Sequence, residues 1–212
     1  MAKAVVSKSK QQEVSIPAMN IQHMEVALVG DSPLVVHAWS EKARRQLLGK
    51  QMGEAQQAKE KKNPEQDFLH SLYWMGKKPN ALSMDDVAKA EFGFPATAFK
   101  AAAVDACSFV DGTTKVEARG AFHVEGDLVR IEGMPTMRED MVRLASGVAD
   151  VRFRGEFRAW RVQLSIRYNA NVLTLQQVVN LFNVAGFAVG VGEHRPQKDG
   201  SWGMFHVARQ GE

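Results

Sequence analysis

The chain has one cysteine among its 212 residues, and it contains no long apolar run. A single cysteine cannot form an internal disulfide, and a membrane-spanning helix needs about 20 consecutive apolar residues. The first ten residues are basic and include no long apolar stretch, so they do not match a secretory signal. We therefore expect a cytoplasmic protein without a membrane partner.

Motifs for metals, nucleotides and nucleophilic catalysis are also missing. The six histidines show neither of the spacings H-x-x-x-H and H-E-x-x-H, and no cysteine cluster accompanies them, which argues against a zinc site. Gly186, Gly190 and Gly192 follow a helical segment, whereas dinucleotide-binding glycines follow a strand and open a helix. Neither a P-loop nor a G-x-S-x-G motif occurs. We expect no cofactor and no metal.

One histidine has a setting that suggests catalysis. His37 lies just before a predicted helix that carries Arg44 and Arg45. An imidazole beside guanidinium groups can act as general acid and base on a phosphate ester. A structural role is the commoner outcome for a lone histidine, and both interpretations stay open at this point.

The spacing of apolar residues predicts an α+β fold. Apolar residues make up 45% of the chain, which supports a substantial core. Alternation predicts strands over 24–28 and 160–168, the second with an arginine-bearing outer face. Phe94-Pro95 precedes an alanine-rich helix over 96–106. Between these elements, 109–134 reads as short strands joined by turns.

The C-terminal third predicts a ferredoxin-like sheet. Thr174 to Gln177 match a capping box that opens an apolar-striped helix, which we expect Gly186 to end. Residues 204–207 form a strand pattern. Strand, helix, glycine-rich loop and strand in this order make one half of a ferredoxin-like, or RRM-like, antiparallel sheet. Residues 137–149 favour either a loop or a short helix.

Composition divides the chain into a tail and one domain. Residues 1–18 are polar and basic, which predicts a flexible tail. Residues 19–212 read as a single α+β domain with helical and β-hairpin insertions. Within it, about 49–66 is rich in Gln, Lys and Glu and has no apolar stripe. We expect this segment to be an exposed insertion that touches a neighbouring subunit or covers a bound strand.

Arginines are concentrated before and along one predicted strand. Five arginines lie between Arg152 and Arg167, against one acidic residue, Glu156. Guanidinium groups bind phosphate in a bidentate manner and stack on bases, so an outward arginine face favours a nucleic acid. The alternative is a solvated strand face with cross-strand ion pairs. The net charge of +3 permits a polyanion without requiring one.

A glycine-rich stretch near the C-terminus gives a second indication of a polyanion. Five glycines occur between Gly186 and Val207, together with His194, Arg195, Lys198 and Trp202. Glycines allow close approach of a backbone to a ligand. Cationic and aromatic side chains among them predict an anionic ligand with flat faces, for which a nucleic-acid strand is suited. A long hairpin with glycine turns is the alternative.

Three segments of the chain resemble one known family. Val189-Gly-Val-Gly-Glu-His-Arg-Pro196, continued by Gly200-Ser-Trp-Gly-Met-Phe-His-Val207, resembles the glycine-rich loop of the RAMP superfamily, the ferredoxin-like RNA-binding proteins of CRISPR complexes. Gly30-Asp-Ser-Pro-Leu34 and Phe94-Pro-Ala-Thr-Ala-Phe-Lys100 are similar to its early turn and helix start. The Gly-Glu-His-Arg-Pro-x-Lys stretch also resembles an uncharacterised group of tailed-bacteriophage proteins. Ala101 departs from the family pattern, which has glycine there.

The resemblance implies a ferredoxin-like fold and binding of a polyanion, in a bacterium or a phage-infected host cell. Together with the charge pattern, it predicts non-catalytic binding of single-stranded RNA or DNA by several copies that self-associate into an oligomer or filament. Arginines and lysines would contact phosphate, glycines would allow close approach, and Trp202 would stack on bases. The predicted nucleic-acid-binding residues are Lys42, Arg44, Arg45, Lys100, Arg152, Arg154, Arg161, Arg167, Gly190, Gly192, His194, Arg195, Lys198, Gly200, Trp202 and Gly203.

Two other functions remain open from the sequence. The chain could be a metal-independent endoribonuclease of the RAMP processing type, with His37 as general acid and base and Arg44 or Arg195 steadying the phosphate. It could instead be a phage structural or assembly subunit whose loop and insertion make protein contacts.

Overall fold

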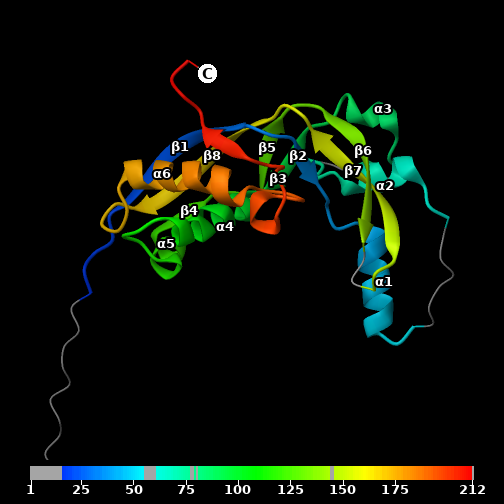
Figure 1. Ribbon diagram of the computed structural model, residues 1–212, viewed down its shortest axis with the longest axis horizontal. Helices are drawn as coiled ribbons and strands as arrows, with labels where there is room; N and C mark the ends of the chain where they lie inside the picture. The colour runs from blue at the N-terminus through cyan, green and yellow to red at the C-terminus, as the bar shows by residue number, and fades with distance from the viewer. Residues whose placement is uncertain (1–15, 55–60, 77–78, 80, 144–145, 212) are drawn as a thin grey trace, which may run out of the picture.

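The computed structural model contains two antiparallel sheets, and the chain passes from one to the other several times (Figure 1). It describes residues 16–54, 61–76, 79, 81–143 and 146–211. Most of the predicted N-terminal tail and the centre of the predicted insertion therefore lie outside the described residues. The larger sheet has six strands and the smaller one has three.

The larger sheet has the strand order of a ferredoxin-like fold. β9, β1 and β8 lie side by side in that order, and β8 then pairs with β4 along one half and β5 along the other. Helix α4 lies between β1 and β4 in the sequence, and α6 lies between β8 and β9. The bounds are β1 Ile21–Gly30, β4 Phe122–Val124, β5 Leu128–Glu132, β8 Arg161–Asn169, β9 Phe205–Val207, α4 Ala96–Ala106 and α6 Leu175–Val184. The predicted α+β, ferredoxin-like fold class is confirmed.

One face of this sheet carries the core. Val162, Leu164 and Ile166 of β8 are fully buried, whereas Gln163 and Arg167 between and beyond them are exposed. This alternation is the period of two that a half-buried strand requires. Helices α4 and α6 lie beneath the sheet in Figure 1, with the short helix α5, Lys115–Ala121, beside them. The opposite face has no helix over it in this view.

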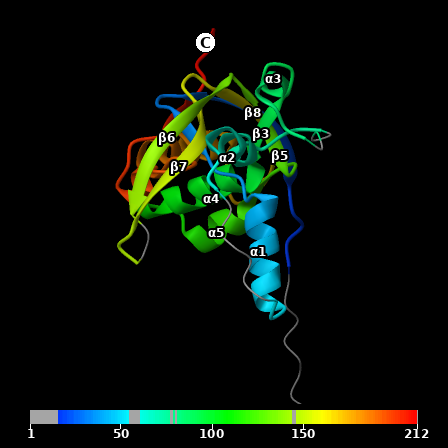
Figure 2. The same cartoon turned by 90° about the vertical axis from the view of Figure 1, so that its right-hand side faces the viewer.

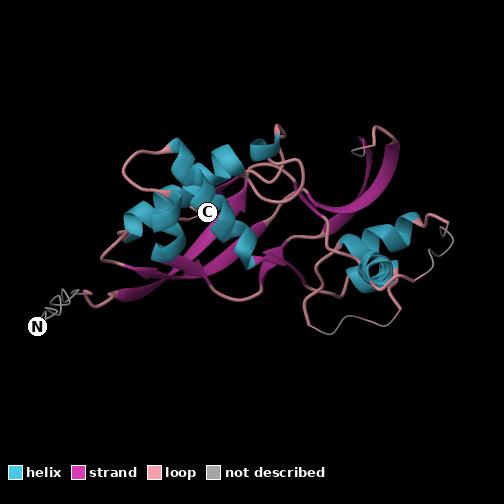
Figure 3. Ribbon diagram, turned by 90° about the horizontal axis from the view of Figure 1, so that it is seen from below, coloured by secondary structure: helices cyan, strands magenta, loops and turns pink. Residues whose placement is uncertain are grey.

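The smaller sheet and the remaining helices are insertions into this framework. Strand β7 lies between β2 and β6. Helix α2 packs on β7, while α1 projects away from the body of the molecule (Figures 1 and 2). Seen from below, these insertions form a separate lobe beside the ferredoxin-like sheet (Figure 3). The bounds of these insertions are β2 Leu34–Val36, α1 Glu41–Gln51, α2 Pro64–Ser71, α3 Met84–Val87, β6 Pro135–Arg143 and β7 Ala149–Phe157. Strand β3, Phe92–Pro95, is the sixth strand of the larger sheet and pairs with β5.

The described ends of the predicted insertion over 49–66 are helical. Gly49 to Gln51 complete α1, and Pro64 opens α2 after the N-cap Asn63. Side chains from Lys61 to Glu65 are exposed. In the part of the chain that the structure describes, none of the helices combines the length and the apolar character needed to cross a bilayer.

Two secondary-structure predictions were wrong. Residues 115–121 form α5 and not a strand, because Thr114 and Glu117 make a capping box whose two side chains bond the opposite backbone N–H groups. Residues 135–143 form β6 and not a loop or helix, since they pair along their whole length with β7. The pairing supplies the hydrogen bonds that the sequence pattern of β6 alone did not indicate.

The predicted end of α6 was also wrong. The helix continues past Gly186 as a π-helical segment, Ala185–Val189, and ends at Gly190, which has φ of 67°. Gly186 has a different role, because a Cβ built there would lie 1.7 Å from the carbonyl oxygen of Phe205. Gly186 therefore lets α6 and β9 approach closely.

We expect Gly186→Ala to lower the free energy of unfolding by more than about 2 kcal/mol, because α6 and β9 must separate to admit the methyl group. The matched control is Gly120→Ala in α5, where an added Cβ meets nothing within 4 Å. That change should stabilise by about 0.5–1 kcal/mol through helix propensity. Urea unfolding of both variants tests this, and equal effects would contradict the close contact.

Candidate nucleic-acid interface

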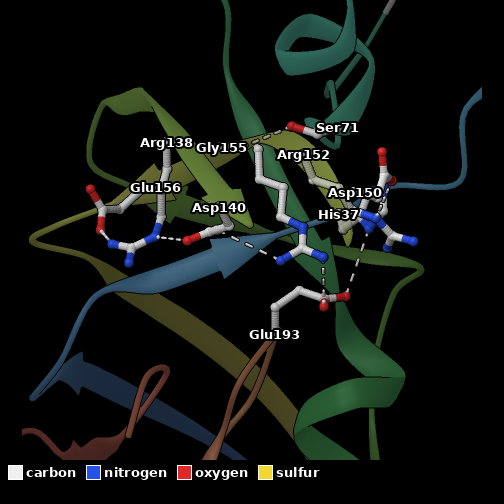
Figure 4. Close-up of polar contacts among 10 residues, drawn as sticks. His37, Ser71, Arg138, Asp140, Asp150, Arg152, Gly155, Glu156 and Glu193 are labelled. Carbon is white, nitrogen blue, oxygen red and sulfur yellow. Dashed lines mark hydrogen bonds and ion pairs between the residues drawn. The ribbon is translucent and has the colours of Figure 1, made fainter. Parts of the chain in front are cut away.

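The arginines of the β6–β7 hairpin are held by carboxylates (Figure 4). Arg154 is only 5% exposed, and its guanidinium lies 3.6 Å from Asp140 and 3.5 Å from Glu193. Arg138 donates to Asp140 at 2.9 Å and to Glu156 at 2.6 Å. Burial makes each of these charges dependent on its partners.

Two further arginines of this region are also paired. Arg152 lies 3.4 Å from Asp150, and Arg158 lies 3.2 Å from Glu156. The prediction that Arg152 and Arg154 belong to an outward arginine face, on an open sheet or at its edge, was wrong for Arg154, which is buried. Both residues belong to β7 of the smaller sheet. The guanidinium of Arg154 points to Glu193, which lies in the glycine-rich stretch near the C-terminus. The cross-strand ion pairs that the sequence left as the alternative are present here.

The glycine-rich loop, Gly190–Gly203, packs against its own chain. Gly203 donates its N–H to the carbonyl of Pro33, and Glu193 donates to that of Val35. Gly203 has φ of 64°, and a Cβ there would lie 1.8 Å from the carbonyl oxygen of Val191. Added Cβ atoms would also meet neighbouring protein atoms within 3 Å at Gly190, Gly192 and Gly200. Internal packing therefore accounts for these glycines, and their predicted contact with nucleic acid remains a prediction.

Trp202 joins the loop to the hairpin. The guanidinium carbon of Arg138 lies 3.9 Å from the centre of the Trp202 ring, and the His194 ring centre lies 4.9 Å from it. The cation–π contact connects Trp202 to the same Arg138 that pairs with Asp140 and Glu156. A base that stacked on this face of Trp202 would have to displace Arg138.

The two cations of the loop differ in their partners. Arg195 donates to the carbonyl of Gly192 at 3.1 Å and to Gln197 at 3.0 Å, so its guanidinium supports the loop itself. Lys198 is exposed in a short 3-10 helix, Pro196–Lys198. Of the predicted loop contacts, Lys198 is thus the more available to a ligand.

A row of basic side chains crosses the open face of the larger sheet. Arg167 of β8 lies opposite His23 of β1 on one side and His123 of β4 on the other, and all three are exposed. Directly opposed residues share a face of the sheet and lie about 5 Å apart. Lys100 of α4 reaches the end of this row, where its amine lies 3.0 Å from Nδ1 of His123. We call His23, Arg167, His123 and Lys100 the basic row.

The basic row has no carboxylate partner within the described part of the chain. Burial and the nearby charge of Arg119 lower the pKa of Lys100. Burial, Lys100 and Arg167 together lower the pKa of His123. Lys100 and Arg167 thus make His123 harder to charge, and an anion bound beside His123 would oppose this effect.

The open face is not uniformly basic. Glu25 accepts from Gln163 at 3.4 Å, and Glu125 accepts from Ser165 at 3.1 Å, one step along the strands from the basic row. Arg161 lies opposite Glu132 of β5. Of the predicted basic face, only the part around Arg167 is free of these nearby acidic residues.

The remaining predicted cations lie on α1. Ser40 caps this helix, because its hydroxyl accepts from the N–H of Ala43 at 3.1 Å. Arg44 and Arg45 are exposed on it, and Lys42 belongs to its first turn. Helix α1 and strand β4 lie at opposite ends of the molecule (Figure 1). The structure thus separates the α1 cations from the basic row.

His37 lines a cleft between α4 and the glycine-rich loop, together with Arg195 and Tyr73. Burial and the charge of Arg154 lower its pKa, and Nδ1 lies 3.9 Å from Glu193, beyond hydrogen-bond distance. Arg44 does not line this cleft. Over the residues described, no group of three or more His, Cys, Asp and Glu side chains is arranged to hold a metal ion.

Sequence reasoning found Lys100 and Arg167 but missed His23 and His123. The alternation of apolar residues in β1 could have indicated His23, because it places His23, one residue before Met24, on the outward face of the strand. The register between β1, β4 and β8 could not be read from the sequence. That register alone brings the two histidines beside Arg167.

Comparison with known proteins gives little further information. No protein-family model matches the chain, and no curated protein matches it. The crystal structure of Cmr6 from Pyrococcus furiosus is similar over 90% of this chain and 100% of that chain, with a TM-score of 0.45 and 9% sequence identity. A similarity of this strength carries no argument about function, so the resemblances to the RAMP superfamily and to phage proteins remain predictions.

We expect Arg154→Ala to lower the free energy of unfolding by about 3 kcal/mol or more, because it removes a buried guanidinium that two carboxylates share and leaves Asp140 with Arg138 alone. Arg167→Ala is the matched control. Its side chain is exposed on a strand of the other sheet, so its loss should cost within about 0.5 kcal/mol. Denaturant unfolding compares the two, and similar losses would mean that the Arg154 pairs contribute no more than a surface charge.

Proposed function

We propose that this protein binds single-stranded RNA or DNA on the open face of its ferredoxin-like sheet, and that it does so without cleaving the strand. The observation that carries the proposal is the basic row. Its side chains come from three strands and one helix, and within the described residues no carboxylate neutralises them.

Charge distribution supports this face over the hairpin. The hairpin arginines Arg138, Arg152 and Arg154 already have carboxylate partners. A phosphate would compete there with existing ion pairs, whereas on the basic row it would meet Lys100 and Arg167 without displacing a carboxylate of the described residues. The phosphate backbone supplies most of the affinity of proteins that bind nucleic acid without sequence specificity. The basic row is therefore the better site for the backbone.

We propose a non-catalytic function because the endoribonuclease alternative needs an available arginine beside His37, and neither of its two candidates meets this need. Arg44 lies outside the cleft that His37 lines. Arg195 lies in it, but its guanidinium is bonded to Gly192 and Gln197. A phosphate would gain little stabilisation beside His37 without a cation that can be directed at it.

Several copies would lie side by side along the strand. Leu47, Leu48 and Met52 are exposed on or just after α1, with exposed fractions of 45%, 45% and 74%. An isolated helix of this length is marginal in water, and an exposed apolar surface on it suits a protein neighbour. This surface is also what the phage structural alternative would use. Self-association that persists after nuclease treatment, without affinity for single strands, would favour that alternative.

The proposal is tested by the salt dependence of binding. Affinity for a fluorescent single strand should fall steeply with salt, and Lys100→Ala with Arg167→Ala should reduce the slope by about 1 to 1.5 by removing two phosphate contacts. Fluorescence anisotropy measures both.

The non-catalytic part of the proposal has its own test. RNA should stay at full length after incubation with the protein in EDTA, and shortened products would favour the endoribonuclease alternative.

Two variants serve as controls for the measurement of salt dependence. Arg130→Ala removes an exposed arginine of the same sheet that pairs with Glu91 at 3.0 Å, and it should leave the slope unchanged. Arg195→Ala with Lys198→Ala tests the glycine-rich loop. If only the loop variant lost affinity, the sheet face would be the wrong surface.

Binding should also strengthen as the pH falls. The pKa of His123 lies below its ordinary value of 6.5 in the free protein, so the imidazole is neutral at pH 7.5. A bound phosphate raises that pKa, and each unit of the rise increases affinity by up to about tenfold. The increase begins as the pH falls through the pKa of the bound form and is complete below the pKa of the free protein. Anisotropy titrations from pH 8 to pH 5.5 measure this. His123→Gln should flatten the profile, and an unaltered profile in that variant would exclude His123.

A further inference from the structure

A cleft of about 240 Å³ lies between α4 and the glycine-rich loop. Its apolar wall is formed by Phe94, Pro95 and alanines of α4, and its other side by residues 189–193. Lys100 and His123 do not line it. The cleft is therefore separate from the basic row.

We infer that this cleft receives the ring of a nucleobase. Ala98, Ala101 and Ala102 leave the space that larger side chains of α4 would fill. Phe94 is held edge-on against Tyr73, with ring centres 5.7 Å apart, so the aromatic wall is fixed in place. A space that combines an apolar wall with a polar rim suits a heteroaromatic ring, which has apolar faces and polar edges.

The charged groups of the rim are already paired. Arg195 donates to Gln197, and Gln197 donates to Asp105 at 2.7 Å. Asp105 also accepts from Lys115 at 2.8 Å, while Glu193 lies beside Arg154. Among the described residues of the lining, Arg195 is the one guanidinium, and it is engaged in this chain. The cleft thus favours an uncharged group over a phosphate.

The neutral hydrogen-bonding groups of the rim are less engaged. The lowered pKa of His37 keeps its imidazole neutral near pH 7, with one donor and one acceptor nitrogen. The Tyr73 hydroxyl donates to the carbonyl of His37 at 3.5 Å, which is a weak bond. Burial, with Glu193, raises the pKa of Tyr73 and keeps the phenol protonated. These groups can exchange hydrogen bonds with the polar edge of a base.

The cleft is formed before any ligand arrives. Val191 donates to the carbonyl of Gly203 at 3.0 Å, and Gly190 donates to that of Ala185 at 2.8 Å. Glu193 is fixed by its own N–H, which donates to Val35. A wall held by backbone hydrogen bonds loses little conformational entropy when a ligand binds.

The ring can come from a base of the bound strand or from a free nucleoside. The inference goes beyond the proposed function, because the cleft binds a base whether or not the basic row binds phosphate. The two claims therefore need separate variants.

The experiment fills the cleft and compares strands with and without bases. Ala101→Trp places a large side chain at an exposed position of α4 that lines the cleft, and Thr97→Trp is the control at an exposed position of the same helix outside it. Each protein is titrated with a strand of about 12 deoxyadenosines and with an abasic strand of the same length. Calorimetry with free adenosine forms the second arm.

The wild-type chain and Thr97→Trp should bind the strand with bases about tenfold more tightly than the abasic strand, and Ala101→Trp should lose this preference. Tyr73→Phe should reduce the preference while the fold is retained.

The other outcomes separate the sources of the base. Adenosine binding that Ala101→Trp abolishes, with an unchanged strand preference, would support the cleft with a free nucleoside as its ligand. No preference and no adenosine binding in the wild type would overturn the inference. Arg167→Ala should weaken both strands equally, so failure of the basic row is distinguishable from failure of the cleft.

Discussion

The buried guanidinium of Arg154 connects the two parts of this molecule. It lies between Asp140 of the hairpin and Glu193 of the glycine-rich loop, so a charge on the smaller sheet is neutralised partly by the loop that leads to β9 of the larger sheet. Trp202, stacked against Arg138, adds a second contact between the same two segments. Because a buried arginine is costly without partners, the hairpin and the loop must be in place together.

This arrangement determines which cations can meet a ligand. The glycine-rich loop and the hairpin, which look most basic in the sequence, use Arg138, Arg154 and Arg195 to hold each other or themselves. The basic row on the sheet makes no such contacts with carboxylates in the described part of the chain. The proposed binding of a polyanion therefore depends on less conspicuous side chains, two of which are histidines. The cleft beside α4, whose charged groups are paired, would accept a base, whereas the basic row would bind a phosphate.

Much of the fold could be predicted because it depends on local patterns. The alternation of β8, the capping box at Thr174 and the alanine-rich α4 each specify an element within a few residues. Strand β6 was missed because its pairing with β7 stabilises it more than its own residues do. The site was harder to predict because it depends on register. Arg154 looked outward in sequence but is buried by contacts over long sequence separations, while His23 and His123 meet Arg167 only through strand pairing.

The central claim is that the phosphate backbone of the nucleic acid contacts the cations of the sheet face, and not those of the glycine-rich loop. Lysine acetylation followed by mass spectrometry tests it directly, since Lys100 belongs to the basic row and Lys198 is exposed on the loop. The lowered pKa of Lys100 increases the fraction of its amine that is uncharged and able to react. The account predicts that a saturating single strand protects Lys100 and leaves Lys198 as reactive as in the free protein. Protection of Lys198 with unchanged modification of Lys100 would contradict it.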